Sequence, residues 1–178
     1  MTDLEEFRNN AIARGLCEGY THMWSDSHTK YQLFKLACDA NSVEFMAKSL
    51  SEGWGLSTDF IEDKFGSYIN GKCICEYKNK KGNGYTSTML CKFCKDSFEV
   101  NTTLLCVLDT KTILDIPDYL FCKIYIAGDS QIEIKLGECS RCDIYVYGGQ
   151  PLLLGDLDKD RVKIVRYINE GSYIQSNT

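Results

Sequence analysis

Cys122-Lys-Ile-Tyr-Ile-Ala-Gly128 returns 20 residues later as Cys142-Asp-Ile-Tyr-Val-Tyr-Gly148. A fixed period of this size is typical of stacked, equivalent structural units. Apolar residues alternate with others within each copy, which is the period of a β-strand. The glycine that ends each copy can adopt the positive φ of a tight corner. The repeat therefore predicts short strands joined at regular corners over about half of the chain.

The repeat extends beyond these two copies in two rows of apolar positions. The first row contains Leu104, Cys106, Ile124, Ile126, Ile144, Val146 and Ile164. The second row, half a period away, contains Thr112, Leu114, Ile116, Ile132, Ile134, Leu136, Leu152 and Leu154. We predict that both rows face inward in a β-solenoid-like repeat of about 20 residues per coil, with two strands per coil. An antiparallel meander or sandwich is the alternative. Polar Asp156 and Arg166 at inward positions indicate a capping coil.

The N-terminal part of the chain, 1–66, has helical rather than strand periodicity. Helices are expected near the N-terminus, from Thr29, over about Ser42 to Leu50, and from Ser57 to a stop at Gly66. We therefore predict an α+β fold, with a bundle of about four helices at residues 1–66 and a β domain at residues 67–178. Within the β domain, the turn signal Lys80-Lys-Gly-Asn-Gly84 predicts a β-hairpin at 68–93, and the repeat region covers 100–168.

Charge and composition exclude several classes of protein. The net charge of −5 and the pI of about 5.1 argue against a general nucleic-acid binder. No apolar stretch approaches the roughly 20 residues of a membrane span, and the acidic start lacks the features of a signal peptide. We therefore expect a cytoplasmic protein without a membrane partner, in which the 10 cysteines stay reduced.

Two cysteine pairs have a spacing similar to that of a zinc ribbon. Cys73-x-Cys75 and Cys91-x-x-Cys94 are two close pairs joined by a short connecting segment, and four thiolates would hold a structural zinc ion. Against this, Cys73 and Cys75 share a strand, and Cys91 and Cys94 would lie on opposite faces of a regular strand. Simple burial of reduced cysteines is the alternative. No other cofactor is expected.

A group of lysines near the predicted hairpin forms a candidate basic patch. Its members are Lys78, Lys80, Lys81, Lys92 and Lys95. These side chains could bind nucleic acid, whereas the alternative is a solvated sheet edge that resists aggregation. The patch is the feature that favours a nucleic-acid partner.

No residue set in the sequence points clearly to catalysis. The two histidines, His22 and His28, flank a polar stretch around Asp26 that is typical of a loop between helices. Gly82-Asn-Gly84 lacks the Lys-Ser/Thr that follows in phosphate-binding loops. We therefore expect a protein that is not an enzyme.

Two further motifs have structural explanations. Cys139-x-x-Cys142 lacks the following helix that lowers the thiol pKa in redox motifs, and Cys142, like Cys122, is interpreted as inward packing. The spacing of Asp156, Asp158 and Asp160 is a little like a calcium loop. It lacks the central glycine and the twelfth-position glutamate of such loops.

Between the inward positions, the repeat carries an apolar and aromatic face that a free monomer would expose at a cost. These outward positions are Leu105, Val107, Tyr125, Ala127, Tyr145, Tyr147, Val165 and Tyr167. The tyrosines Tyr125, Tyr145, Tyr147 and Tyr167 form a candidate binding face. Packing of the chain's own helices on them is the alternative.

Most of the chain shows a resemblance to a group of bacterial and phage proteins. Phe7-Arg-x-x-Ala11-x-x-Arg14-Gly15-Leu16-Cys17, Glu52-Gly53-Trp54-Gly55-Leu56 and Phe65-x-x-Tyr68-Ile69-Asn70-Gly71 lead into the β-repeat tail. This arrangement is similar to uncharacterised small proteins of gut Bacteroidales and their phages or mobile elements. The resemblance implies an intracellular bacterial or phage protein, but no activity and no functional residues.

The sequence therefore favours a non-enzymatic protein-binding protein of bacterial or phage origin. One version is an inhibitor of a host defence system such as a CRISPR nuclease, in which acidic charge occupies a nucleic-acid channel. The alternatives are a zinc-stabilised nucleic-acid-binding module and a phage structural or assembly protein. The expected partner is another protein or a second copy of the chain, with nucleic acid reached only through the lysine patch.

Overall fold

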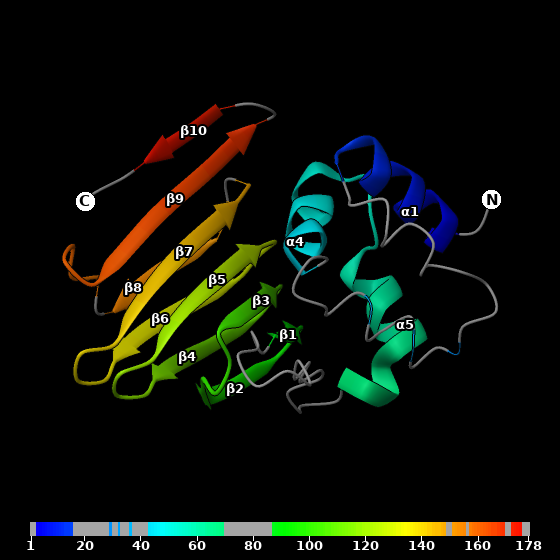
Figure 1. Ribbon diagram of the computed structural model, residues 1–178. Coiled ribbons are helices and arrows are strands. Elements are labelled where there is room, and N and C mark those ends of the chain that lie inside the picture. The colour runs from blue at the N-terminus through cyan, green and yellow to red at the C-terminus, as the bar shows by residue number, and fades with distance from the viewer. Residues whose placement is uncertain are drawn as a thin grey trace, which may run out of the picture.

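The computed structural model describes residues 3–15, 29, 32, 36, 43–69, 87–148, 151–155, 157–169 and 172–175. Within these ranges, helices α1 (Asp3–Ala13), α4 (Val43–Glu52) and α5 (Thr58–Ile69) precede the strands (Figure 1). The strands are β1 (Ser87–Cys91), β2 (Cys94–Glu99), β3 (Leu104–Leu108), β4 (Lys111–Ile116), β5 (Phe121–Ala127), β6 (Gln131–Leu136), β7 (Arg141–Tyr147), β8 (Leu152–Gly155), β9 (Val162–Asn169) and β10 (Ser172–Gln175).

The strands form a β-solenoid, as the 20-residue repeat predicts, and not an antiparallel meander. Sheet A has the strand order β1-β3-β5-β7-β9-β10, and sheet B has the order β2-β4-β6-β8. From β1 to β9, successive strands alternate between the sheets, so each of about four turns gives one strand to each sheet. Neighbouring strands run parallel, except that β10 pairs antiparallel with β9 at the edge of sheet A.

The interior of the solenoid is an apolar core between the two sheets. Cys122 lies beside Cys142 in the register of β5 and β7, and Ile124 lies beside Ile144. Ile144 in turn lies beside Ile164 of β9. Cys122 and Cys142 are buried, which confirms the interpretation of these two residues as inward packing.

One coil is a residue shorter than the repeat, and this reverses the side chains of β3. Leu105 lies beside Ile124 of β5, where a regular repeat would place Leu104. Leu105 and Val107 therefore belong to the core between the sheets, while Leu104 and Cys106 face the helices. The predicted directions of these four residues were wrong, because a one-residue change of register moves every side chain of a strand to its other face.

The last coil of sheet B deviates in the opposite sense. Leu153 of β8 lies beside Ile132 of β6, where a regular repeat would place Leu152. Leu153 is therefore buried, whereas Leu152 and Leu154 are 47% and 50% exposed. The prediction that Leu152 and Leu154 face inward was wrong, because the coil that leads to β8 holds one residue more than the repeat.

The corners that end the strands of sheet A share one backbone conformation. Asp109, Gly128 and Gly148, which follow β3, β5 and β7, have φ values of 44°, 70° and 82°. Buried Thr110 and Ser130 come soon after the first two of these residues, and their hydroxyls donate to strand-end carbonyls at 2.9 and 2.7 Å. Gly128 and Gly148 thus confirm the expected role of glycine at the corners.

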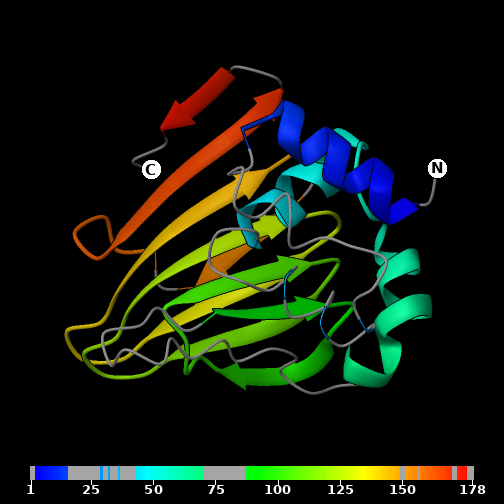
Figure 2. The ribbon, with the colours of Figure 1, turned by 45° about the vertical axis from the view of Figure 1, so that its right-hand side comes forward.

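The helices lie on sheet A as a layer and do not form a bundle. α4 packs on β3, β5 and β7, α5 packs on β1, and α1 packs on α4 (Figures 1 and 2). The prediction of about four helices in a bundle is not supported: the helices whose bounds fall within the described residues are α1, α4 and α5, and they share one core with the outer face of sheet A. The apolar sides of the helices pack against this face of the sheet, whereas in a bundle they would pack against one another.

Side chains form caps at the two helix starts that the sequence predicts at Thr29 and Ser57. The hydroxyl of Ser57 accepts the Phe60 backbone N–H at 3.1 Å at the start of α5. Thr29 and Gln32 bond reciprocally, each side chain accepting the other's backbone N–H at 3.2 and 2.8 Å, which is a capping box. The expected stop at Gly66 was wrong, since α5 continues to Ile69. A glycine inside a helix costs only about 1 kcal/mol, which packing can offset.

The predicted hairpin at 68–93 falls largely outside the described residues, including its turn at 80–84. Of the described part, residues 68–69 belong to α5. The predicted second strand contains β1, which pairs in parallel with β3. The division of the chain at residues 66 and 67 stays a prediction.

Candidate functional site

Four tyrosines form two stacked pairs, which together we call the tyrosine ladder, on the outer face of sheet A. Their positions follow from the repeat, because Tyr125 and Tyr145 are register partners, as are Tyr147 and Tyr167. The rings of Tyr125 and Tyr145 stack with centroids 5.3 Å apart. Those of Tyr147 and Tyr167 stack at 4.8 Å with planes 6° apart. Aromatic pairs of this kind add to the stability of the sheet.

The helical layer covers half of this ladder. Tyr125 and Tyr147 are 8% and 2% exposed and share a core with α4, whereas Tyr145 and Tyr167 are only partly buried. The Tyr147 hydroxyl donates to Oε1 of Glu44 on α4 at 3.0 Å. Burial raises the pKa of Tyr125 and Tyr147, so both stay protonated at neutral pH. Intramolecular packing therefore accounts fully for Tyr125 and Tyr147, whereas Tyr145 and Tyr167 pack against the same core and keep part of their surface exposed.

Polar contacts hold the helical layer to the corners of the solenoid. Thr58, at the start of α5, donates its hydroxyl to Oδ2 of Asp109 at 2.5 Å. The other oxygen of Asp109 accepts the backbone N–H of Asp129 at 2.8 Å. Lys92, at the first corner, pairs with Asp59 and with Glu62 of α5. These contacts hold α5 at the corners, and the bond of Tyr147 with Glu44 holds α4 on the sheet, so the covered area ends beside these two helices.

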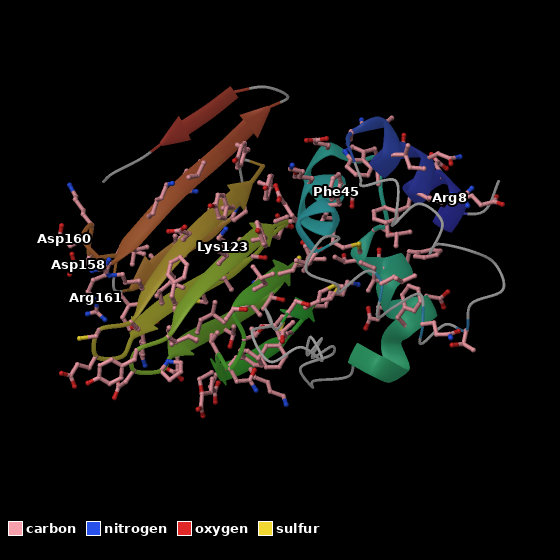
Figure 3. All side chains as sticks on the ribbon, in the orientation of Figure 1. Arg8, Phe45, Lys123, Asp158, Asp160 and Arg161 are labelled. Atoms are coloured by element: carbon pink, nitrogen blue, oxygen red, sulfur yellow. The ribbon has the colours of Figure 1, made fainter. Side chains whose placement is uncertain are left out.

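Beyond that limit lies a surface that we call the open face, formed by outward residues at the starts of β5, β7 and β9. It consists of Phe121, Lys123, Arg141, Asp143 and Lys163, with Tyr145 and Tyr167 at its border with α4. Figure 1 shows the helices at the far ends of these strands, and Figure 3 labels Lys123 on the sheet beside them. Phe121, Arg141 and Lys163 are exposed and Lys123 is half-buried. The open face is therefore basic and partly aromatic.

The zinc hypothesis gains no geometric support from the described cysteines. Cys91 ends β1 and is buried against the helices, whereas Cys94 begins β2 and is exposed. Burial raises the pKa of the Cys91 thiol to about 12, which disfavours a thiolate. Cys73 and Cys75 lie outside the described residues. Among the described residues, no three His, Cys, Asp or Glu side chains gather closely enough to hold a metal ion.

The candidate lysine patch is only partly described. Lys78, Lys80 and Lys81 lie outside the described residues. Lys92 is held by the carboxylates of α5, which raise its pKa. The ammonium of Lys95 lies 5.5 Å from the centre of the Phe93 ring. The described part of the patch thus has intramolecular contacts.

The remaining sequence candidates come together at no described site. His22, His28, Asp26 and Asp156 lie outside the described residues. Asp158 and Asp160 are exposed in the loop before β9 (Figure 3), where Asp158 accepts the backbone N–H of Asp160 at 3.0 Å. This bond explains the pair as part of a turn. Cys139 is exposed at a corner, and burial raises the pKa of the Cys142 thiol to about 12.

Arg161 is a structural residue that the sequence did not single out. Its guanidinium donates to the carbonyl oxygens of Gly137 and Ser140, at the corner between β6 and β7.

No helix within the described part of the chain combines the length and apolar character that a membrane crossing needs.

Comparisons with protein-family models, curated proteins and solved structures found no match for this chain. The site must therefore be judged on its own geometry.

The charged part of the open face was not recognised in the sequence, although a signal for it exists. Lys123, Asp143 and Lys163 follow one another at steps of 20 residues on outward positions. In a solenoid, residues at that step are adjacent in space. Attention to charged as well as apolar repeat positions would have placed these three side chains in one row.

Proposed function

We propose that this chain is a non-enzymatic protein of bacterial or phage origin that binds another protein through the open face. The observation that carries the proposal is the division of the tyrosine ladder. Tyr125 and Tyr147 are covered by α4, while their stacking partners Tyr145 and Tyr167 keep exposed surface at the border of the open face. Aromatic side chains in such positions are enriched at protein interfaces, where they supply a rigid contact area.

The state of the thiols supports a binding rather than a catalytic role. Burial raises the pKa of Cys91, Cys122 and Cys142 to about 12. At neutral pH each is a protonated thiol, which is neither a good nucleophile nor a metal ligand. These cysteines serve the packing of the two cores.

A more specific version of the proposal is an inhibitor of a host defence system, such as a CRISPR nuclease. The net charge of −5 supports it, since an acidic protein can occupy a channel that normally receives nucleic acid. In this version the open face contacts the nuclease protein, and acidic surface elsewhere on the chain faces the channel.

Site-specific photo-cross-linking tests the proposal. A benzophenone amino acid replaces Tyr167 at the border of the open face, or Lys135 on the exposed side of sheet B as the matched control. In a Bacteroidales lysate, we expect one specific protein adduct from position 167 and none from position 135. Unlabelled wild-type protein should compete for the adduct, whereas a Tyr145→Ala, Tyr167→Ala double variant should not.

Circular dichroism and thermal unfolding of the double variant show whether the ladder truncation has left the fold intact. An adduct that forms equally at both positions would count against the proposal. Equal competition by the folded double variant would do the same, because the partly exposed tyrosines would then have no part in binding.

A further inference from the structure

We propose that the open face binds an acidic protein segment, an assignment that rests on the proposed function and names the chemical class of its partner. The face is locally basic on a chain that is acidic overall. It carries three cations, Lys123, Arg141 and Lys163, against one carboxylate, Asp143. The whole chain has 20 Lys and Arg residues against 25 Asp and Glu residues. This local excess of positive charge requires a physical explanation.

The three cations are not used by the fold. Within the described residues, no carboxylate lies at ion-pair distance from Lys123, Arg141 or Lys163, and their side chains make no hydrogen bond. Asp143 lies between the two lysines in the register and can compensate one charge at most. The cations therefore remain available to a partner, which is the arrangement that gives electrostatic complementarity at an interface.

Carboxylates on neighbouring elements do not pair with these cations. Exposed Asp118, Glu138, Asp158 and Asp160 lie in the corners that lead into β5, β7 and β9, and among the described residues none is at ion-pair distance from Lys123, Arg141 or Lys163. Arg161 is bound to the corner carbonyls of Gly137 and Ser140 and adds no free cation. On the adjacent helix α4, Glu44 pairs with Lys48 at 2.9 Å, so this pair is neutral as a unit. The surplus thus belongs to the open face itself.

The spacing of the lysines fits an extended chain. Lys123 and Lys163 are separated by two strand spacings, or about 10 Å between backbones. Carboxylates on one side of an extended segment lie at every second position, so those four positions apart are separated by about 13 Å, which two flexible lysine side chains can reach. Phe121, which is 52% exposed beside Arg141, offers apolar contact at one end of this row.

A protein segment fits these observations better than a nucleic acid does. Asp143 stands in the middle of the cationic row and would repel a continuous phosphate backbone, whereas a polypeptide can place a neutral side chain there. At longer range, the net charge of −5 also repels a nucleic acid.

A titration with an acidic peptide, in which each glutamate is followed by three neutral residues, tests the assignment. The fluorescent peptide is titrated with the full chain, and an oligothymidylate with the same number of charges serves as the competing class. We expect the peptide to bind, with an affinity that falls as NaCl rises from about 50 to 300 mM. The triple variant Lys123→Glu, Arg141→Glu, Lys163→Glu should bind at least about tenfold more weakly, because three exposed ion pairs become repulsive.

A matched charge reversal on the other side of the solenoid provides the control. Lys111→Glu with Lys135→Glu alters exposed residues of sheet B, and this variant should lose no more affinity than its general change in net charge explains. Thermal unfolding confirms that both variants are folded. Absence of peptide binding, equal loss in both variants, or tighter binding of the oligothymidylate would each overturn the assignment.

Failure of this inference can be told apart from failure of the proposed function. If the cross-link at position 167 forms and the triple variant still competes for it, the face binds a protein, but not through its cations. If no cross-link forms while the triple variant loses peptide affinity, the charge assignment stands and the proposed use of the tyrosines does not.

Discussion

Leu153 and Leu154 offer a direct test of the solenoid register. The 20-residue repeat places Leu154 inside and Leu153 outside, whereas the structure has the reverse arrangement. Leu153 is 7% exposed and lies in the core between the sheets, while Leu154 is 50% exposed on the outer side of β8. We therefore expect Leu153→Ala to destabilise the protein and Leu154→Ala to have little effect.

The magnitudes follow from the burial of the two side chains. Truncation of a buried leucine to alanine costs about 2–5 kcal/mol. Leu153 lies in the last strand of sheet B, where relaxation is easiest, so we expect the lower part of this range, about 2–3 kcal/mol. The exposed Leu154 side chain should change the free energy of unfolding by no more than about 0.5 kcal/mol.

Equilibrium urea unfolding of the two variants and the wild type measures this difference. Amide hydrogen exchange on β6 and β8 shows whether the last turn opens by itself, which would hide part of the effect from a global measurement. A larger loss of stability, or of exchange protection, for Leu154→Ala than for Leu153→Ala would refute the shifted register of β8 and the lengthened coil that produces it.

Three further predictions concern the helical layer and the buried thiols. Thr58→Val should lower the free energy of unfolding, measured in urea, by about 1.5–3 kcal/mol, because it removes a hydrogen bond to the Asp109 carboxylate. Thr58→Ser should retain most of the stability, and an unchanged free energy of unfolding in Thr58→Val would contradict the contact. Gly55→Ala should cost about 1–3 kcal/mol by thermal unfolding, since its Cβ would lie 2.0 Å from that of Ser49; an unchanged midpoint would mean that the two backbones are further apart. The last prediction concerns thiols whose pKa burial raises from 9.0 to about 12, namely Cys91, Cys122 and Cys142. The unfolded chain releases these protons near pH 9 and the folded chain only near pH 12. The free energy of unfolding should therefore fall as pH rises through this window, by up to about 1.4 kcal/mol per pH unit and thiol. Urea unfolding at several pH values checks this, a Cys122→Ala variant should show a weaker pH dependence, and a flat profile would show that the thiols are not desolvated.

The solenoid could be predicted because its signal is local and repeated. Alternation within Cys122–Gly128 and its copy identifies strands, and the constant step identifies their stacking. The deviating coils at β3 and β8 could not be predicted in the same way. An insertion or deletion of one residue in a corner leaves the apolar composition unchanged, yet it reverses the face of the next strand. Leu104 and Leu105, or Leu153 and Leu154, are equally apolar, so the sequence alone cannot distinguish them.

The candidate site shows the same limit. The repeat predicted that Tyr125, Tyr145, Tyr147 and Tyr167 share an outer face, and the stacking distances agree with this. How much of the face the helices would cover could not be predicted, because it depends on long-range contacts such as Tyr147 with Glu44 of α4. The basic row through Lys123 was detectable at its regular step, but its availability became evident only from the absence of ion-pair partners among the described residues.

By itself, the sequence determined that this chain builds stacked coils with an apolar interior and an aromatic outer face, because short-range periodicity is sufficient to specify strands and their repeat. Only the tertiary structure decided the register of the irregular coils, the layer of helices on sheet A and the extent of the open face. These properties depend on contacts between residues far apart in the chain, such as Tyr147 with Glu44. The energies of such contacts are comparable with the small differences between alternative packings, so local sequence patterns do not resolve them.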